Sequence, residues 1–380
     1  MKIAIISPYL TNYGGASRFS WEFANYLAKK GDKISYISLY ADRTKYDSKN
    51  GIEVIDIMNE QYLTQSIKFW LNLKQIRKKL HKIILKEKPD IVFFNNFPST
   101  LWAQKFDNIP TICYPHDIEL LYGNTYIQNL NKMQYWLWKI FRLFLRSYEK
   151  TLWKNFDLII SNSKFTSKNI FKEYGRKSLV LHPGTNIQKF ISNGNKERAI
   201  ITFASQKSQN PEILLQAVSN LNDDDSNFEI WIIGDDFQYR TKLTEYANKL
   251  HVKPKIKFFG KVTDDELIKL YSKSMACIHL VYDPPFGIII IESMSCKTPV
   301  IAIKPGGVEE IIEHNVDGFL IGKDDFINLN NYLIKILNNP EYGLELGLQA
   351  RNKIEHMFDQ EKQFEKIRNN ILEQINYKKT

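Results

Sequence analysis

Short apolar runs alternate with segments of helical periodicity along most of the chain. The run Ile3–Ser7 is short and apolar, as is typical of a buried strand, and a segment of helical period follows from about Ala16 to Lys30. Gly31 ends this helix, and the next strand covers Lys33–Leu39. Alternating strands and helices predict a parallel sheet covered by helices on both faces.

The same alternation continues through two successive halves. In the first half we expect helices at Leu63–Glu87 and about Asn129–Lys154, and strands at Val54–Ile57, Ile91–Phe94, Thr111–Tyr114, Leu158–Ser161 and Leu179–Leu181. In the second half we expect a helical C-terminus from Pro340 to Tyr377, helices at Pro211–Asn220, Asp264–Tyr271 and Ile288–Ser295, and strands at Ala199–Phe203, Glu229–Ile233, Ile256–Phe259, Ala276–Leu280, Val300–Ile303 and Phe319–Ile321. A polar stretch at 183–196 predicts a linker between domains 1–182 and 197–357, and the cleft between them is the expected site.

Composition narrows the class of protein. The chain has 380 residues, of which 43% are hydrophobic and 25% charged, and this composition excludes a disordered, collagen-like or coiled-coil protein. The cysteines Cys113, Cys277 and Cys296 lie far apart, which predicts neither disulfides nor zinc and favours a reducing cytoplasm. The first apolar run is too short for a signal peptide, and no run approaches the roughly 20 residues of a membrane span.

Charge is unevenly distributed between the two halves. The formal net charge is +10, with +13 in residues 1–182 and −3 in the remainder. A basic half predicts an anionic partner, which could be nucleic acid, phospholipid headgroups or a phosphorylated substrate. The alternative is that the lysines only cover solvated faces.

Two glycine-rich turns are candidate anion sites. Gly14 and Gly15 follow the first strand and precede a helix, and Gly306 and Gly307 occupy the same kind of position in the second half. Glycine allows the backbone to approach a ligand closely, and a helix N-terminus offers unpaired N–H groups to a phosphate. An ordinary tight turn is the alternative for each.

Carboxylates and a histidine follow other strands. Glu292 lies in an apolar segment, where a carboxylate needs a partner such as a pair of sugar hydroxyls, although a helix-surface position is the alternative. His116 and Asp117 follow the strand Thr111–Tyr114, where His116 could contact a reacting sugar or be structural. The acidic runs Asp223–Asp225 and Asp235–Asp236 lack convincing metal-ligand spacing, so we expect no metal and no cofactor.

Two basic segments of the first half suggest a membrane surface. The helix Leu63–Glu87 is rich in lysine, and the segment Tyr135–Arg146 mixes aromatic and basic residues at helical spacing. Rings lie among headgroups and bases contact lipid phosphates at an anionic bilayer surface, so a peripheral location at the inner face of the cell membrane is one expectation. A core helix with a solvated basic edge is the other.

These motifs together resemble the retaining glycosyltransferases of family 4. The segment from Phe286 to Ala302 is similar to the family's E-P-F-G-x-x-x-x-E-A-M-A-C-G-x-P-V-I-A signature, and Gly306–Glu310 with Asp317–Leu320 is similar to its G-G-x-x-E and N-G-x-L stretch. The N-terminal half matches in order at Tyr114–Asp117, Asp157–Ser163 and His182–Gly184. The resemblance implies the α/β GT-B architecture: two Rossmann-like parallel-sheet domains facing a central cleft, with a C-terminal helix at about 358–380 crossing back to the first domain.

The resemblance also implies a role for each matched residue. Glu292 would bind the donor's ribose, His116 would lie against the transferred sugar, and Lys261 and Val262 would line the nucleobase. The donor sugar and its phosphates would be held by Gly14, Gly15, Phe286, Gly287, Ile288, Gly306, Gly307 and Glu310. The co-substrate would be a UDP- or GDP-linked sugar, and the acceptor a growing or lipid-linked saccharide.

The chain departs from the family pattern at three positions. The first carboxylate of the family's Glu-x7-Glu pair falls on Pro284, with Asp283 one residue away, and the family's Arg and Lys fall on Ala204 and Gln209. Lys207 and Asp283 are therefore the candidate catalytic substitutes. The open alternatives are a degenerate binding or scaffold protein, an epimerase or phosphorylase of the same architecture, and a DNA-modifying transferase.

Overall fold

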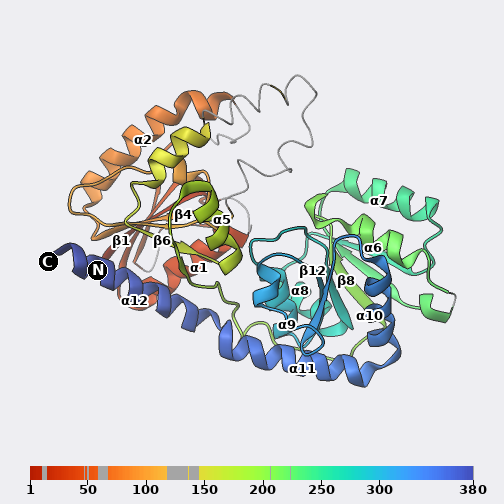
Figure 1. Ribbon diagram of the computed structural model, residues 1–380. Helices are drawn as coiled ribbons and strands as arrows, with labels where there is room; N and C mark the ends of the chain where they lie inside the picture. The colour runs from red at the N-terminus through yellow and green to blue at the C-terminus, as the bar shows by residue number, and fades with distance from the viewer. Residues whose placement is uncertain are drawn as a thin grey trace. The chain divides into compact units, whose positions relative to one another are not determined.

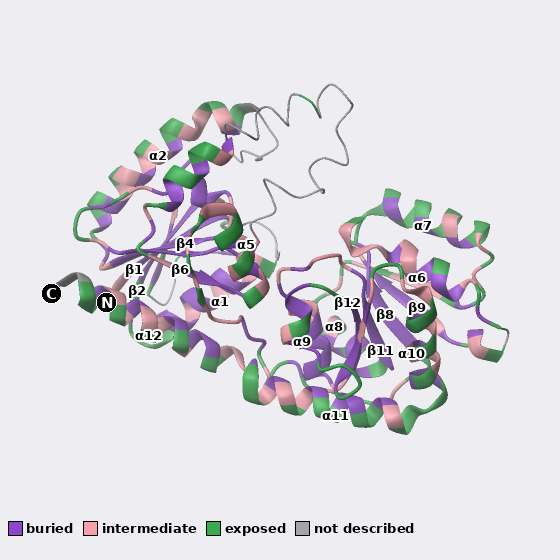
Figure 2. Cartoon of the chain, viewed as in Figure 1, coloured by how far each residue is buried: buried purple, intermediate pink, exposed green. Residues whose placement is uncertain are grey.

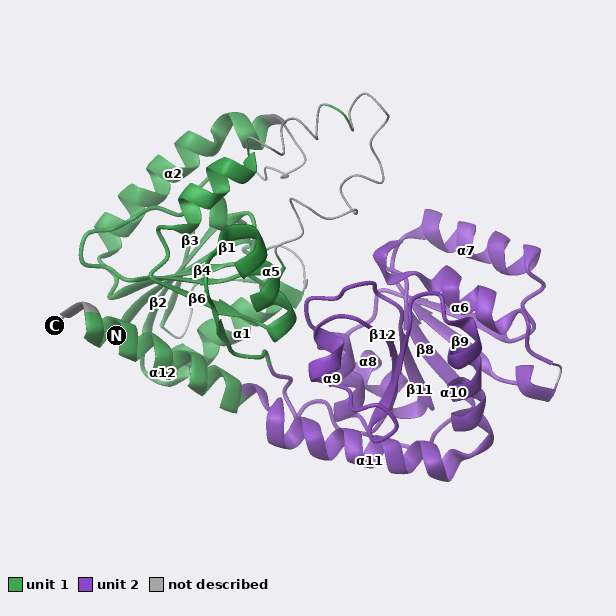
Figure 3. Ribbon diagram, in the orientation of Figure 1, with its two compact units in different colours: residues 1–183, 361–380 green, residues 184–360 purple. Residues whose placement is uncertain are grey.

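The chain divides into two α/β units, residues 1–183 with 361–380 (unit 1) and residues 184–360 (unit 2), coloured separately in Figure 3. The computed structural model, drawn in Figure 1, describes residues 1–10, 15–46, 48, 51–58, 67–117, 136, 145–205, 207–222 and 224–379. Gly14 and most of the segment Tyr135–Arg146 lie outside the described residues.

Unit 1 is built on a parallel sheet of seven strands in the order β3-β2-β1-β4-β5-β6-β7. The strands are β1 Lys2–Leu10, β2 Lys33–Ala41, β3 Ile52–Asp56, β4 Ile91–Asn95, β5 Thr111–Tyr114, β6 Leu158–Ser161 and β7 Leu179–Val180. Strand order reverses between β1 and β4, because the chain first runs from β1 toward β3 and then returns to the other side of β1. Ligands of open α/β sheets bind at the carboxyl ends of strands beside such a reversal.

Helices cover both faces of this sheet. They include α1 Gly15–Lys29, α2 Ile67–Glu87, α5 Lys164–Tyr174 and α12 Gln360–Lys379. The C-terminal helix α12 packs into the same core as α1: Phe364 contacts the rings of Phe19 and Phe23, and Arg368 pairs with Asp32 at 3.0 Å. The return of the C-terminal helix to the first unit is therefore confirmed (Figures 1 and 3).

Unit 2 repeats the design with a parallel sheet of six strands in the order β10-β9-β8-β11-β12-β13. The strands are β8 Ala199–Phe203, β9 Glu229–Ile233, β10 Lys255–Gly260, β11 Ala276–His279, β12 Val300–Ile303 and β13 Gly318–Ile321. They are mostly buried, as the purple arrows in Figure 2 show, because helices cover both faces. Strand order reverses between β8 and β11.

The helices of unit 2 begin and end at clear sequence signals. They are α6 Pro211–Val218, α7 Phe237–Lys249, α8 Asp264–Lys273, α9 Ile288–Ser295, α10 Phe326–Asn338 and α11 Pro340–Met357. The Thr263 side chain accepts from the Glu266 amide and Glu266 accepts in return from the Thr263 amide, which is a capping box at the start of α8. Pro211 and Pro340 occupy the first positions of α6 and α11, where proline costs no hydrogen bond.

The helical C-terminus consists of two helices, α11 and α12, with Phe358 and Asp359 between them. Residues of the predicted linker 183–196 pack on unit 2: Phe190 is fully buried in its core, and Thr185 pairs with Asp359 in an isolated parallel bridge. Polarity alone predicted a linker, whereas Phe190 finds an apolar site that only the folded unit supplies.

Candidate functional site

The candidate residues of unit 2 gather at one edge of its sheet. Lys207 follows β8, Lys261 and Val262 follow β10, and Asp283 follows β11. The other candidates also follow β11 or β12: Phe286, Gly287, Ile288, Glu292, Gly306, Gly307 and Glu310. Since all six strands are parallel, these loops leave the same carboxyl edge, and those after β8 and β11 flank the reversal of strand order. Sheet topology thus places at one edge residues that lie up to 103 positions apart, from Lys207 to Glu310.

Glu292 lies one turn into α9, which begins directly after Gly287. The residue is only 4% exposed, so the surface alternative raised by the sequence is wrong. Burial, and to a smaller extent the charge of Glu292, raises the pKa of the Cys277 thiol of β11 to about 12. The structure therefore has a buried carboxylate beneath the carboxyl edge of the sheet.

In unit 2, the loop after β11, which contains Gly287, packs directly against the loop after β12, which contains Gly306 and Gly307. The Gly307 amide donates to the Pro284 carbonyl at 2.7 Å, and a Cβ at Gly307 would lie 2.3 Å from the Pro285 oxygen. Gly306 has φ +156°, and a Cβ there would lie 2.5 Å from the Pro284 ring. Glycine is therefore required at both positions for the loop after β12 to reach the loop after β11.

The helix expected after Gly306 is a single 3₁₀ turn, Gly307–Glu310. The sequence-based expectation of a full helix is wrong here, since a turn of four residues carries little macrodipole. Glu309 Oε2 accepts from the Gly306 amide at 3.3 Å, whereas Glu310 is half-buried. Any anion at this turn would depend on local N–H groups.

Asp283 and Lys207 occupy different surroundings. Asp283 is half-exposed with φ +49°, and its Oδ2 pairs with Lys323 Nζ at 2.8 Å. Lys207 is exposed on a short 3₁₀ turn, and Gln209 Oε1 closes that loop by accepting from the Ser205 amide at 2.7 Å. Lys323 comes from the loop after β13, and sequence reasoning missed it because the family motifs contain no residue at that position.

Lys261 and Val262 follow the irregular end of β10. Gly260 has φ +65° and its carbonyl accepts from the Gly234 amide at 3.0 Å. Beyond it, Lys261 is exposed and Val262 packs against the unit 2 core. These two residues thus follow the strand farthest from β13, at the same carboxyl edge as the start of α9.

In unit 1, His116 follows β5 at the carboxyl edge of the sheet. Its Nε2 lies 2.9 Å from Asn95 Oδ1, and its ring contacts Phe19 and Tyr114. Desolvation lowers the pKa of His116 to about 3, so the ring is neutral at physiological pH. Sequence reasoning missed Asn95, although an asparagine at the end of the apolar run Ile91–Phe94 was a visible signal.

Gly15 is the first residue of α1 and follows β1 after the gap at 11–14. A Cβ built at Gly15 would meet no atom within 4 Å, so the space beside it is open. The first turn of α1 is attached to β4, because Asn95 Nδ2 donates to the Ala16 carbonyl at 3.2 Å. Within unit 1, Asn95 therefore links His116 to Ala16, the residue that follows Gly15.

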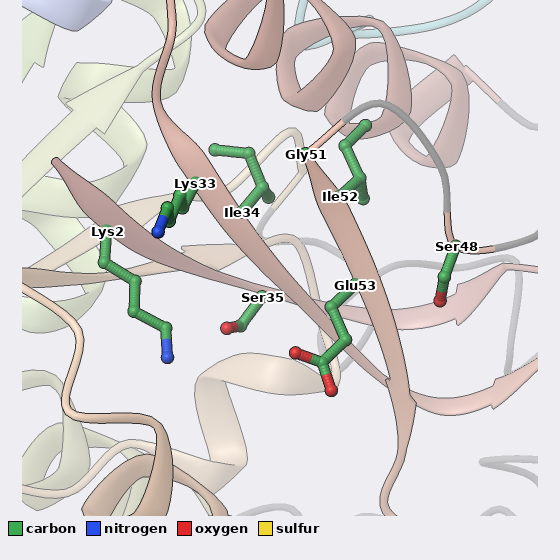
Figure 4. Close-up of a pocket in the computed structure, with 8 residues that line it drawn as sticks. All are labelled: Lys2, Lys33, Ile34, Ser35, Ser48, Gly51, Ile52 and Glu53. Carbon is green, nitrogen blue, oxygen red and sulfur yellow. The ribbon is translucent and has the colours of Figure 1, made fainter.

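A pocket of about 450 Å³ lies elsewhere in unit 1 (Figure 4). It is lined by Lys2, Lys33, Ile34, Ser35, Ser48, Gly51, Ile52 and Glu53. These residues lie at or near the amino ends of β1, β2 and β3, the edge opposite to His116. The pocket therefore does not belong to the candidate site.

Within the described ranges, no three His, Cys, Asp or Glu side chains are grouped so that they could hold a metal ion. Nor, among the helices of those ranges, is any both long and apolar enough to cross a bilayer.

Comparisons with known proteins agree with this architecture. The model of the family "Glycosyltransferase Family 4" matches residues 13–189, and that of "Glycosyl transferases group 1" matches residues 185–353. The first three curated relatives are matched over about half of their own length, 56%, 49% and 49%. A longer match, 26% identical over 93% of both chains, is to a Campylobacter jejuni protein named as an N-acetylgalactosaminyltransferase acting on an undecaprenol-linked saccharide.

Solved structures share the fold. Sucrose-phosphate synthase from Thermosynechococcus elongatus superimposes with a TM-score of 0.82 at 18% identity, covering 98% of both chains. The Anabaena protein HepE, solved in complex with UDP-glucose, gives a TM-score of 0.74 at 17% identity, covering 98% of this chain and 100% of that one. With two Rossmann-like parallel sheets, a returning C-terminal helix and family matches that together span 13–353, the chain belongs to the GT-B glycosyltransferases of group 1, the family-4-like class.

Proposed function

We propose that the protein is a retaining glycosyltransferase that moves a sugar from a UDP- or GDP-linked donor to a hydroxyl of a growing or lipid-linked saccharide. The observation that carries the proposal is the buried Glu292 carboxylate at the carboxyl edge of the six-stranded sheet. A buried carboxylate accepts two hydrogen bonds from adjacent hydroxyls, which is the pattern that a ribose presents. The UDP-glucose complex of HepE and the lipid-linked substrate in the name of the Campylobacter protein support this donor and acceptor class.

The chemistry follows from where charge develops. As the bond to the anomeric carbon breaks, negative charge grows on the departing diphosphate, and preorganised donors stabilise it. The first N–H groups of α9, which have no intrahelical acceptor, and the exposed Lys207 would supply those donors. In the proposal the acceptor attacks the same face, and a phosphate oxygen takes its proton. No metal is required for this scheme.

The test is transfer from labelled UDP- and GDP-sugars to extracted lipid-linked saccharides. The wild type should transfer label from one donor, and Glu292→Ala should abolish both the transfer and nucleotide binding. Glu345→Ala, an exposed position on α11, is the matched control and should change neither. Absence of transfer from every donor, with nucleotide binding intact, would instead establish the degenerate binding protein that Ala204, Gln209 and Pro284 suggest.

We also propose that α2 binds an anionic membrane surface. Its outer face presents Leu71 and Leu85, 78% and 55% exposed, among the exposed lysines Lys68, Lys74, Lys78, Lys82 and Lys86. The spacing of three and four residues places these side chains along one stripe. The helix's only carboxylate, Glu87, is buried and paired with Lys2 at 3.0 Å, so it does not offset this charge. Lipid phosphates complement such a stripe, and apolar side chains among the lysines fit a bilayer interface better than a nucleic acid.

Vesicle flotation tests this surface. The wild type should float with phosphatidylglycerol-containing vesicles at low salt and be released at high salt. The triple variant Lys74→Glu/Lys78→Glu/Lys82→Glu should remain unbound, whereas Lys242→Glu/Lys249→Glu/Lys269→Glu, with the same charge change on unit 2, should float. Failure of the wild type to float, or salt-sensitive binding of duplex DNA with comparable affinity, would exclude the membrane assignment.

A further inference from the structure

Asn95 joins two parts of the candidate site in unit 1. It ends β4 and is fully buried. Its Nδ2 donates to the Ala16 carbonyl at 3.2 Å and to Ser7 Oγ at 3.3 Å, while its Oδ1 lies 2.9 Å from His116 Nε2. A buried amide with these contacts fixes its three partners, because losing one of them would leave a buried polar atom unpaired.

These contacts determine which proton His116 carries. A carbonyl oxygen can only accept, so the Asn95 group that faces Ala16 must be the amide nitrogen. The Asn95 oxygen therefore faces His116, and it too can only accept, so Nε2 must bear the hydrogen. In a neutral ring with Nε2 protonated, Nδ1 carries a lone pair and is a hydrogen-bond acceptor.

The surroundings keep the ring neutral. It is packed by Phe19 of α1 at 4.7 Å and Tyr114 of β5 at 4.8 Å between centroids, with Asn95 of β4 at its Nε2. Tyr114 is the titratable group among these three, and burial holds its pKa well above 10, so it is uncharged. The Asn162 amide donates to the His116 carbonyl at 2.8 Å and fixes the backbone from β6, and Asp117 is the adjacent ionisable residue of the chain.

We propose that Asn95 is a positioning residue that holds His116 as the neutral Nε2–H tautomer, so that Nδ1 accepts a hydrogen bond from a sugar hydroxyl and does not bind phosphate. A phosphate requires donors, whereas a hydroxyl can donate to this lone pair. The same residue fastens the first turn of α1, next to Gly15, to the strand that holds His116. The hydroxyl as ligand rests on the proposed function, whereas the tautomer does not.

The ring nitrogens report the tautomer directly. In nitrogen-15 NMR, the ring signals of His116 are those that disappear in His116→Gln. In the wild type these signals should show one neutral Nε2–H form from about pH 5 to 8. Asn95→Asp places a carboxylate at Nε2 and should favour the imidazolium, raising the pKa of His116 by at least about one unit. Ser7→Ala removes a neighbour of Asn95 but keeps its oxygen, so the tautomer should not change. An Nδ1–H or charged ring in the wild type would overturn the proposal even if Asn95→Asp does not fold.

Calorimetry separates this inference from the proposed function. UDP or GDP alone should bind wild type and His116→Phe equally, since the proposed nucleotide contacts lie on unit 2. UDP-glucose or GDP-mannose should lose about tenfold in affinity in His116→Phe, which removes the Nδ1 acceptor and with it one hydrogen bond, and nothing in Ser7→Ala. If neither nucleotide binds, the proposed function fails while the NMR result stands. If the nucleotide sugar binds all three proteins equally, the hydroxyl assignment is wrong.

Discussion

Asp283 and Lys323 form an ion pair of 2.8 Å that joins the loop after β11 to the loop after β13. We predict that Asp283→Asn lowers turnover by about a hundredfold or more, since general acid–base groups contribute about 10²–10⁴-fold. Both side chains are more than one-third exposed, so the unfolding free energy should change by less than about 1 kcal/mol.

Lys323→Ala distinguishes a catalytic role of Asp283 from a structural role of its ion pair. It breaks the same ion pair but leaves the Asp283 carboxylate in place, so turnover should stay near the wild-type value. Steady-state kinetics and urea unfolding of both variants provide the measurements. Equal losses of turnover in the two variants would show that the pair matters as a structural link, and would remove Asp283 from the catalytic candidates.

Glu292 should control nucleotide affinity. Glu292→Gln keeps the size of the side chain but removes its charge, and we expect the affinity for the cognate nucleoside diphosphate to fall about tenfold to a hundredfold, the worth of hydrogen bonds to a charged group. Calorimetry measures this, with Glu345→Gln as the surface control. Unchanged affinity in Glu292→Gln would exclude ribose binding by this carboxylate.

Gly307 is required by packing. In Gly307→Ala the new Cβ would lie 2.3 Å from the Pro285 oxygen, so the loop must shift and the unfolding free energy should fall by about 1–3 kcal/mol. Gly15→Ala meets no atom within 4 Å and should leave stability unchanged. Urea denaturation measures the unfolding free energy of both variants. Equal values would show that the loops after β11 and β12 can move apart at no cost.

Lys196 should make stability depend on pH. Its Nζ donates to Thr298 Oγ1 at 2.6 Å, and burial lowers the pKa of this amine from 10.5 to about 7. Between about pH 7 and 10.5 the unfolded chain therefore binds more protons at this site than the folded one, so the unfolding free energy should rise with pH across that range. The contribution of Lys196 to the unfolding free energy is complete above pH 10.5 and is lost as pH falls toward 7.

Replacing Lys196 by Met removes the titrating group and retains an unbranched side chain. Urea unfolding at several pH values should show a shallower rise in Lys196→Met than in the wild type. Lys253→Met, which removes a lysine whose Nζ donates to the Leu221 carbonyl at 3.4 Å, should keep the wild-type slope. Identical slopes in wild type and Lys196→Met would mean that the amine is charged in the folded protein.

The sequence by itself determined the alternation of strands and helices and hence the two parallel sheets. Runs such as Val300–Ile303 are short, apolar and bounded by turn residues, so their type follows from local pattern. It also singled out Glu292, because a carboxylate among isoleucines had to be buried with a partner or displaced to the surface. These are properties of neighbours along the chain, which one sequence contains.

The tertiary structure alone decided which distant groups meet. Asn95 and His116 lie 21 positions apart, and they come together because β4 and β5 are adjacent parallel strands whose ends share an edge. Lys323 reaches Asp283 across 40 positions because the loops after β11 and β13 leave the same edge of one sheet, although β12 lies between the two strands. Phe190 finds its apolar site only in the folded core of unit 2. Local pattern fixes what each segment becomes, but hydrogen bonds and packing between segments depend on strand order, which no single stretch of sequence encodes.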